Sequence, residues 1–140
     1  MTYYTDLSPY EYFPESIPSG VTARNVGWLD TGHDYTRGPA PDPFLEGLRE
    51  LVRNSRQMRT RGWHRCLLPH DNKEIEYPLS VEIADAKVSL GGAEIRVVAE
   101  SGDWLIAPDL VYHYVTEHSY RPPEVFIEAV TARRAASITQ

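Results

Sequence analysis

The stretch that decides the fold runs from Leu79 to Ala107 and reads LSVEIADAKVSLGGAEIRVVAESGDWLIA. Apolar and polar residues alternate along it with a period of two, which is typical of β-strands with one buried face. The alternating apolar positions are Leu79, Val81, Ile83, Ile95 and Val97. Gly91-Gly92 is a signal for a two-residue hairpin, and residues 100–103 predict the next turn. The stretch therefore predicts an antiparallel β-meander with one solvated face.

Helical spacing of apolar residues appears on both sides of these strands. Residues 44–54 follow Asp42, which is a favourable N-cap residue. After the strands, prolines open two further helices over residues 108–118 and 124–132. We expect an α+β fold in which about four or five antiparallel strands are packed by one central helix and two C-terminal helices.

The length of 140 residues predicts a single domain spanning residues 1–140. Residues 1–23 are rich in proline and tyrosine, so we expect an irregular aromatic arm that packs on the domain as a lid. Residues 24–30 predict a short strand, and residues 133–140 are expected to fray. The expected core residues are Trp28, Leu48, Leu51, Val81, Ile83, Ile95, Val97, Leu110, Tyr114, Phe126 and Val130.

The overall charge limits the classes of partner. Fourteen basic and twenty acidic residues give a net charge of −6, which excludes the basic footprint of a nucleic-acid-binding protein and suits a basic protein partner. No apolar run approaches the length of a membrane span, so no membrane association is expected. Residues 1–6 lack the features of a secretory signal, and we expect a cytoplasmic protein.

The segment Trp63–His70, WHRCLLPH, suggests a metal site. If it is extended, alternation places His64 and Cys66 on one face. Imidazole nitrogen and thiolate sulfur are ligands that zinc prefers, and iron is the second candidate. His70 lies four residues beyond Cys66, after a proline.

A further ligand must come from elsewhere in the chain. His33 follows the strand predicted over residues 24–30 and is the best local candidate, with Asp30 or Asp34 as substitutes. The alternative is that Cys66 is a small buried apolar residue and the histidines are surface polar groups.

His113 and His118 belong to the helix predicted over residues 108–118. Positions five apart on a helix diverge by roughly 140°. We therefore expect these two histidines not to share a metal, with His118 packed near the core and His113 facing solvent or another element.

Complete catalytic signatures are missing from the sequence. It contains no phosphate-binding glycine loop and no nucleophile elbow around a serine. Two functional classes stay open: an acidic binding module of unknown partner, such as an immunity-like or accessory protein with or without a structural metal, and a small metalloenzyme or tailoring enzyme. In the second, His64, Cys66 and His70 would leave one metal position open for a substrate.

Several segments together resemble a family of small bacterial proteins of unknown function, seen largely in actinomycetes. They are MTYYTDLSPYEYF, NVGWLD, FLEGLREL, RGWHRC, LGGAEIRV and APDLVYHYVTEHSYRPPEVFIEAV. The resemblance is collinear over nearly the whole chain and implies a free-standing cytoplasmic domain. It also implies a His-x-Cys-x-x-Cys pattern, which with His33 would form a two-histidine, two-cysteine zinc site. Here Pro69 stands in place of the second cysteine, and His70 is its candidate replacement.

Overall fold

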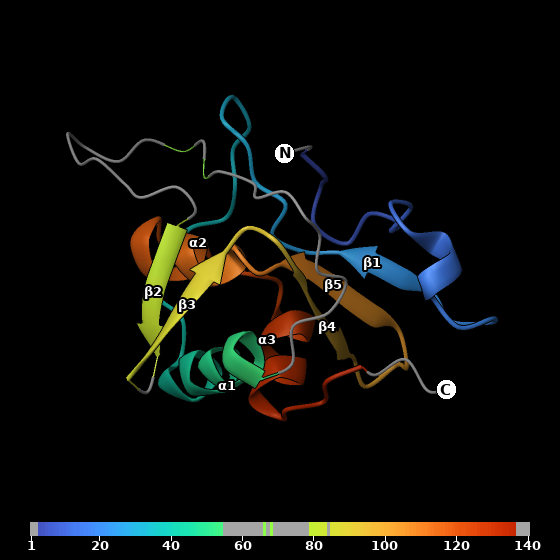
Figure 1. Ribbon diagram of the computed structural model, residues 1–140. Coiled ribbons are helices and arrows are strands. Elements are labelled where there is room, and N and C mark those ends of the chain that lie inside the picture. Colours follow the sequence, from blue (N-terminus) through green and yellow to red (C-terminus); the bar gives the residue numbers. More distant parts are fainter. Residues whose placement is uncertain (1–2, 55–65, 67, 69–78, 84, 137–140) are drawn as a thin grey trace.

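Three α-helices, five strands and one 3₁₀ turn make up the described structure (Figure 1). The computed structural model describes residues 3–54, 66, 68, 79–83 and 85–136. The elements in chain order are η1 (Pro14–Ser16), β1 (Ala23–Asn25), α1 (Asp42–Asn54), β2 (Leu79–Ile83), β3 (Ala86–Leu90), β4 (Glu94–Val98), β5 (Trp104–Pro108), α2 (Val111–Glu117) and α3 (Glu124–Thr131). The predicted α+β class is confirmed.

The strands form two small sheets instead of one continuous meander. β2 and β3 pair antiparallel, and the second sheet has the order β1-β5-β4. β4 and β5 are antiparallel, as predicted, but β1 runs parallel to β5. A parallel pair needs a long crossover connection. The long chain between β1 and β5, which includes α1, provides one.

Gly91-Gly92 does not close a hairpin, so that prediction was wrong. β3 pairs with β2 and β4 pairs with β5, and the two glycines carry the chain from one sheet to the other. Gly91 adopts φ +107° and donates its N–H to the Asp109 carboxylate at 2.7 Å. Two glycines permit a sharp turn, but they do not determine which strand becomes the partner.

Both edges of the three-stranded sheet are covered by irregular chain. On the β1 side, the N–H of Leu7 donates to Asn25 and that of Tyr10 donates to Ala23, so the aromatic arm lies along the strand. On the β4 side, Val98 N–H donates to the Arg134 carbonyl at 2.8 Å. Residues 134–136 were expected to fray, but pairing with β4 satisfies their backbone groups.

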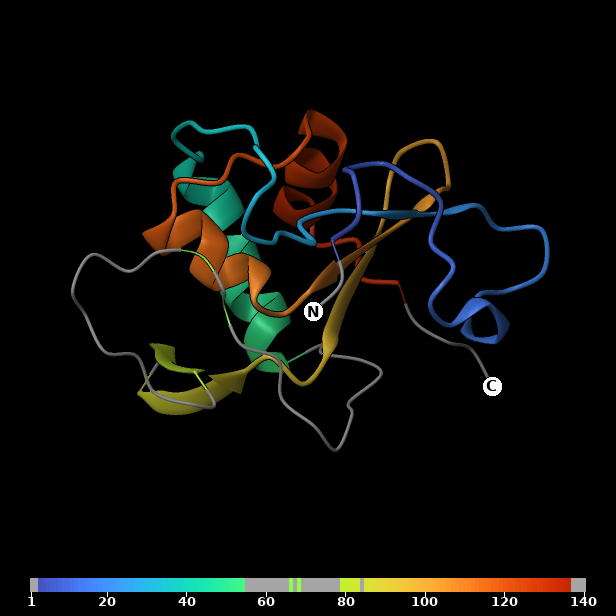
Figure 2. The same cartoon turned by 90° about the horizontal axis from the view of Figure 1, so that it is seen from above.

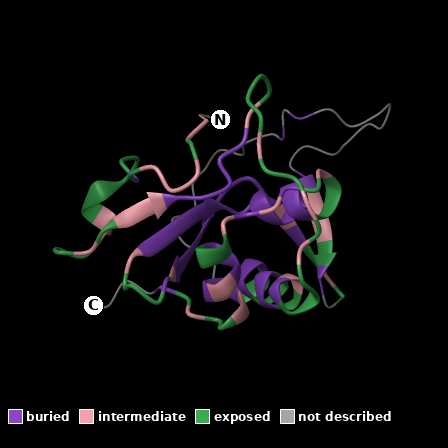
Figure 3. Ribbon diagram, turned by 180° about the vertical axis from the view of Figure 1, so that it is seen from behind, coloured by how far each residue is buried: buried purple, intermediate pink, exposed green. Residues whose placement is uncertain are grey.

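α1 packs against α3, and α3 also contacts β4 (Figure 2). Gly47 allows the two helices to approach closely, because a Cβ atom there would lie 2.5 Å from the Val130 carbonyl oxygen. All predicted core residues are buried except Val81, which is half-buried in the two-stranded sheet. Figure 3 shows that β5 and most of α2 are buried, whereas η1 is largely exposed.

α2 is shorter than the predicted helix over residues 108–118. Pro108 ends β5, and the helix begins at Val111 and ends at Glu117. His118 therefore lies outside the helix, which is decisive for the site described below. Within the described residues, no helix combines the length and the apolar character required to cross a bilayer.

Candidate metal centre

Cys66, His113 and His118 bring three metal-binding atoms together. The Sγ of Cys66 lies 3.4 Å from the Nε2 of His118, which lies 3.2 Å from the Nε2 of His113. All three ligand atoms lie within 4.8 Å of one another. Cys66 and His113 are buried and His118 is half-buried, so the group is largely withdrawn from solvent.

These separations fit tetrahedral zinc. With Zn–N bonds of about 2.0–2.1 Å and a Zn–S bond of about 2.3 Å, two nitrogen ligands lie about 3.3 Å apart, and nitrogen and sulfur about 3.6 Å apart. The observed distances of 3.2 Å and 3.4 Å are close to these values. Two of the three pairs of ligand atoms therefore already have the separations of a tetrahedral zinc site, and the third pair lies within 4.8 Å.

The expectation that His113 and His118 diverge was wrong. It assumed one continuous helix, but His118 has φ −119° and ψ 10° and has left the helical path. Its N–H donates to the Tyr114 carbonyl at 3.0 Å, and Ser119 follows with φ +56°. A left-handed residue commonly ends a helix. The non-helical φ of His118 rotates its own side chain away from the direction that a continuous helix would give it.

Three hydrogen bonds from distant segments hold this turn in place. Tyr35 donates its hydroxyl to the His118 carbonyl at 3.1 Å. The Gly38 N–H donates to the Ser119 carbonyl at 3.0 Å, and the Tyr120 hydroxyl donates to the Asp6 carboxylate at 2.8 Å. The position of His118 thus depends on the aromatic arm and on the loop before α1.

Without a bound metal, the side chain of Cys66 is a neutral thiol at neutral pH. Burial raises its pKa to about 11, although a backbone hydrogen bond with Leu68 acts in the opposite direction. A zinc ion bound here would displace the proton and bind the thiolate. Metal binding at this site should therefore release a proton at neutral pH.

The comparisons with known proteins add a family. Residues 2–131 match the model of a family described as a domain of unknown function, DUF7919. The chain belongs to this family. No curated protein and no solved structure shows significant similarity to it.

Tyr114 adds an unusual polar atom beside the site of this DUF7919 domain. Its ring centroid lies 6.2 Å from that of His113 and 6.4 Å from that of His118. Its hydroxyl is buried and has no hydrogen-bond partner among the described residues. Burial raises the pKa of Tyr114 well above its usual value, and the negative charge of a Cys66 thiolate would raise it further.

Of the predicted ligands that lie within the described residues, the structure places Cys66 in this group and not His33. His33 is exposed and stacks on Tyr3, with ring centroids 3.9 Å apart. His64 and His70 lie outside the described residues, so their part in the site stays a prediction. Asp30 accepts a hydrogen bond from the N–H of Thr31 through its Oδ1.

Sequence reasoning missed His113 and His118 as a pair. The available signal was the pair of prolines at 122–123, which follows His118 closely and marks a chain that has already left the helix. An earlier helix end would have removed the angular argument against a shared metal.

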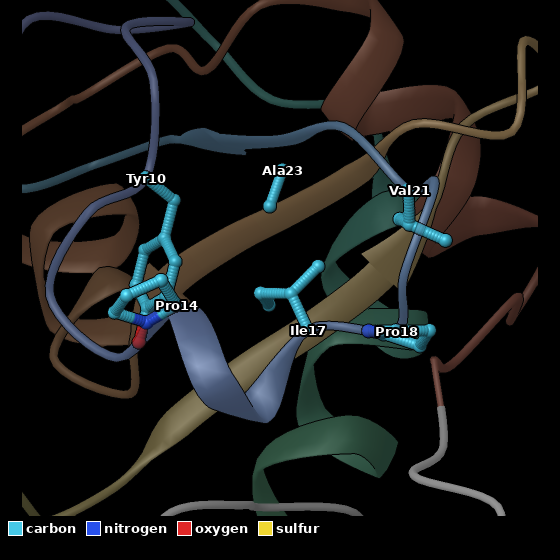
Figure 4. A pocket seen from close by; sticks show the side chains of 6 residues that line it. All are labelled: Tyr10, Pro14, Ile17, Pro18, Val21 and Ala23. Carbon is cyan, nitrogen blue, oxygen red and sulfur yellow. The ribbon is translucent and has the colours of Figure 1, made fainter.

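A hollow beneath the aromatic arm offers less chemistry. It has a volume of about 210 Å³ and is lined by Tyr10, Pro14, Ile17, Pro18, Val21 and Ala23 (Figure 4). The Tyr10 hydroxyl donates to Glu94 at 2.9 Å and accepts from Arg96 at 3.1 Å. Its polar atom is thus used within the protein, and the hollow specifies no ligand class.

Proposed function

We propose that this DUF7919 domain is a small metal-binding module in which Cys66, His113 and His118 bind zinc. The observation that carries the proposal is the convergence of one sulfur and two imidazole nitrogens within 4.8 Å. These atoms come from parts of the chain about fifty residues apart. Mixed thiolate and imidazole donors favour zinc, and iron is the second metal to test.

The ion would act as a structural cross-link. Cys66 belongs to the chain between α1 and β2, whereas His113 lies in the first turn of α2 and His118 directly follows its last residue. A metal bound to all three would connect these segments, and structural zinc sites contribute directly to the free energy of folding. The buried position of Cys66 and His113 supports this role.

A structural zinc site has four protein ligands, so a fourth is required. His64 is our first candidate, because alternation in an extended segment would place it on the same side as Cys66. His70 is the other candidate from the sequence, whereas His33 is exposed and stacks on Tyr3 outside the group.

We also propose that the module acts by binding a basic protein in the cytoplasm, as an immunity-like or accessory protein would. The net charge of −6 supports such a partner, because electrostatic complementarity speeds and steers association.

A metalloenzyme is the second candidate, and Tyr114 is the observation that favours it. A buried hydroxyl without a partner is costly and is frequently explained by a function. If the fourth metal position held water, the Tyr114 hydroxyl would be a nearby donor for a metal-bound oxygen. The two candidates therefore differ in whether the fourth ligand is a protein side chain or an exchangeable molecule.

Elemental analysis of protein purified without a metal-chelating tag tests the site. We expect one equivalent of zinc in the wild type, and strong loss in Cys66→Ser, His113→Gln and His118→Gln. His33→Gln is the matched control, because His33 is exposed and stacks on Tyr3 outside the group. Full metal content in Cys66→Ser would refute the proposed ligand set.

Cobalt substitution then separates the two candidates. Thiolate-to-cobalt charge transfer should report Cys66, and the ligand-field bands should report four-coordination. In a structural site, His64→Gln or His70→Gln should change these bands, and added azide should not. A spectrum that responds to azide but not to either histidine variant would favour the metalloenzyme.

A further inference from the structure

A second cavity, separate from the metal centre, lies between the aromatic arm and the loop before α1. We call it the tyrosine cavity. It has a volume of about 170 Å³ and is lined by Tyr3, Tyr4, Thr5, Asp6, Leu29, Asp34, Tyr35 and Thr36. Its lining thus combines three tyrosines with two aspartates, and no basic residue of the described part of the chain belongs to it.

The three rings are fixed by contacts outside the cavity. Tyr3 stacks on His33, and Tyr4 packs edge-on against Trp28 with centroids 5.6 Å apart. Tyr35 packs against Tyr120 at 6.0 Å and donates its hydroxyl to the His118 carbonyl. All three rings are half-buried, so they form preorganised walls that a ligand can still reach.

The two carboxylates of the cavity differ in their hydrogen bonding. Asp6 accepts hydrogen bonds from Gly27 and Tyr120 and forms no ion pair with the described residues. Asp34 is exposed, and within the described part of the chain it has neither a hydrogen bond nor an ion pair. The two carboxylates of the cavity therefore form no ion pair with the described residues, and that of Asp34 lies exposed.

One of these rings already contacts a cation of the protein itself. The guanidinium carbon of Arg37 lies 4.4 Å from the centroid of the Tyr35 ring. Cations are attracted to aromatic faces, and the planar guanidinium stacks on them more readily than an ammonium does. This contact indicates which type of cation the cavity suits.

We propose that the tyrosine cavity binds the guanidinium group of an arginine side chain presented by a basic protein partner. The rings contact the planar cation, and Asp34 supplies the opposite charge at the rim. The proposal specifies the partner of the binding module proposed above, but it rests on a different site from the metal centre.

The test is an NMR titration of the full chain with N-methylguanidinium, with N-methylurea as the uncharged analogue of the same shape. We expect saturable shifts of the Tyr3, Tyr4 and Tyr35 ring signals, with half-saturation at about 1–10 mM. N-methylurea should produce none. Equal responses to the two compounds would overturn the proposal.

Matched variants locate the effect. Asp34→Asn should weaken binding about two- to fivefold, while Glu100→Gln removes the same charge from an exposed turn and should leave binding unchanged. Tyr3→Leu should weaken binding about two- to fivefold, and Tyr3→Phe should retain it. Unchanged binding in both Asp34→Asn and Tyr3→Leu would rule the cavity out.

A blocked Gly-Arg-Gly peptide tests the source of the cation. It should bind at least as tightly as N-methylguanidinium, and exclusion of the peptide would show that the cavity admits only a free small molecule. Zinc content is measured on the same samples. If protein that contains zinc does not bind the probe, the arginine site is overturned and the metal centre is not. If protein that contains no zinc binds the probe, the arginine site is supported and the metal centre is not.

Discussion

The Nε2 atoms of His113 and His118 lie 3.2 Å apart, although five sequence positions separate the two residues. On a continuous helix these side chains would diverge. They meet because α2 ends at Glu117 and His118 has a non-helical backbone conformation, after which the chain reverses through Ser119. The candidate metal centre is thus a product of a helix end, and it should respond to changes that alter this turn.

Ser119→Gly should stabilise the protein by about 1 kcal/mol and preserve metal binding. Ser119 has φ +56°, a conformation that is costly for residues with a Cβ atom and accessible to glycine. Chemical denaturation measures the effect. Ser119→Val should destabilise the protein and reduce zinc content, because a β-branched side chain resists this conformation. Equal free energies of unfolding for the two variants would show that the turn does not require a left-handed conformation at residue 119.

The zinc-free protein should lose stability at high pH through Cys66. Burial raises the pKa of its thiol to about 11, above the unfolded value of about 8.5. The neutral thiol therefore stabilises the fold fully below about pH 8.5, and this contribution, about 3 kcal/mol, is lost as pH rises toward 11. Melting temperatures measured between about pH 8.5 and pH 11 should fall more steeply for chelator-treated wild type than for Cys66→Ala.

The zinc-loaded protein should show the opposite dependence. The metal binds thiolate and neutral imidazole, so protons compete with it and zinc should dissociate as pH falls below about 6. Zinc release can be followed with a colorimetric chelator. Retention of zinc at pH 4 would argue against imidazole ligands.

Arg96→Met should destabilise the fold by about 3–5 kcal/mol. Arg96 and Glu94 form a buried ion pair at 2.8 Å, and the variant leaves the carboxylate without its cation. Burial already raises the pKa of Glu94 despite this pair, and the loss of Arg96 should raise it further. Arg24→Met is the control: its ion pair with Asp103 is partly exposed and should be worth at most about 1 kcal/mol. Similar losses in both variants would contradict the role of burial.

Gly47→Ala should destabilise the protein by about 1–3 kcal/mol, although alanine favours helices by about 1 kcal/mol. The added Cβ atom would lie 2.5 Å from the backbone oxygen of Val130 on α3. Backbone cannot yield as a flexible side chain does, so the clash should outweigh the propensity. Urea unfolding measures the effect. A higher free energy of unfolding for Gly47→Ala would show that α1 and α3 can move apart at little cost.

The sequence by itself determined the elements whose signals are local. Period-two alternation located β2 and β4, the turn at residues 100–103 located β5, and helical spacing located α1 and α3 close to their observed limits. The spacing of apolar residues indicates which face of each element is buried. The predicted core is therefore confirmed apart from the half-buried Val81. Cys66 was also recognised as a metal-ligand candidate, because its residue type is independent of the fold.

Only the tertiary structure decided which elements pair and which side chains meet. The glycines at 91–92 permit a turn in either arrangement, so the choice of β5 as the partner of β4 depends on packing between distant strands. His118 reaches His113 because Tyr35 and Asp6, both far away in sequence, secure the turn that follows α2. Local propensity cannot encode such contacts: they form only once the arm, the loop before α1 and the end of α2 share one surface.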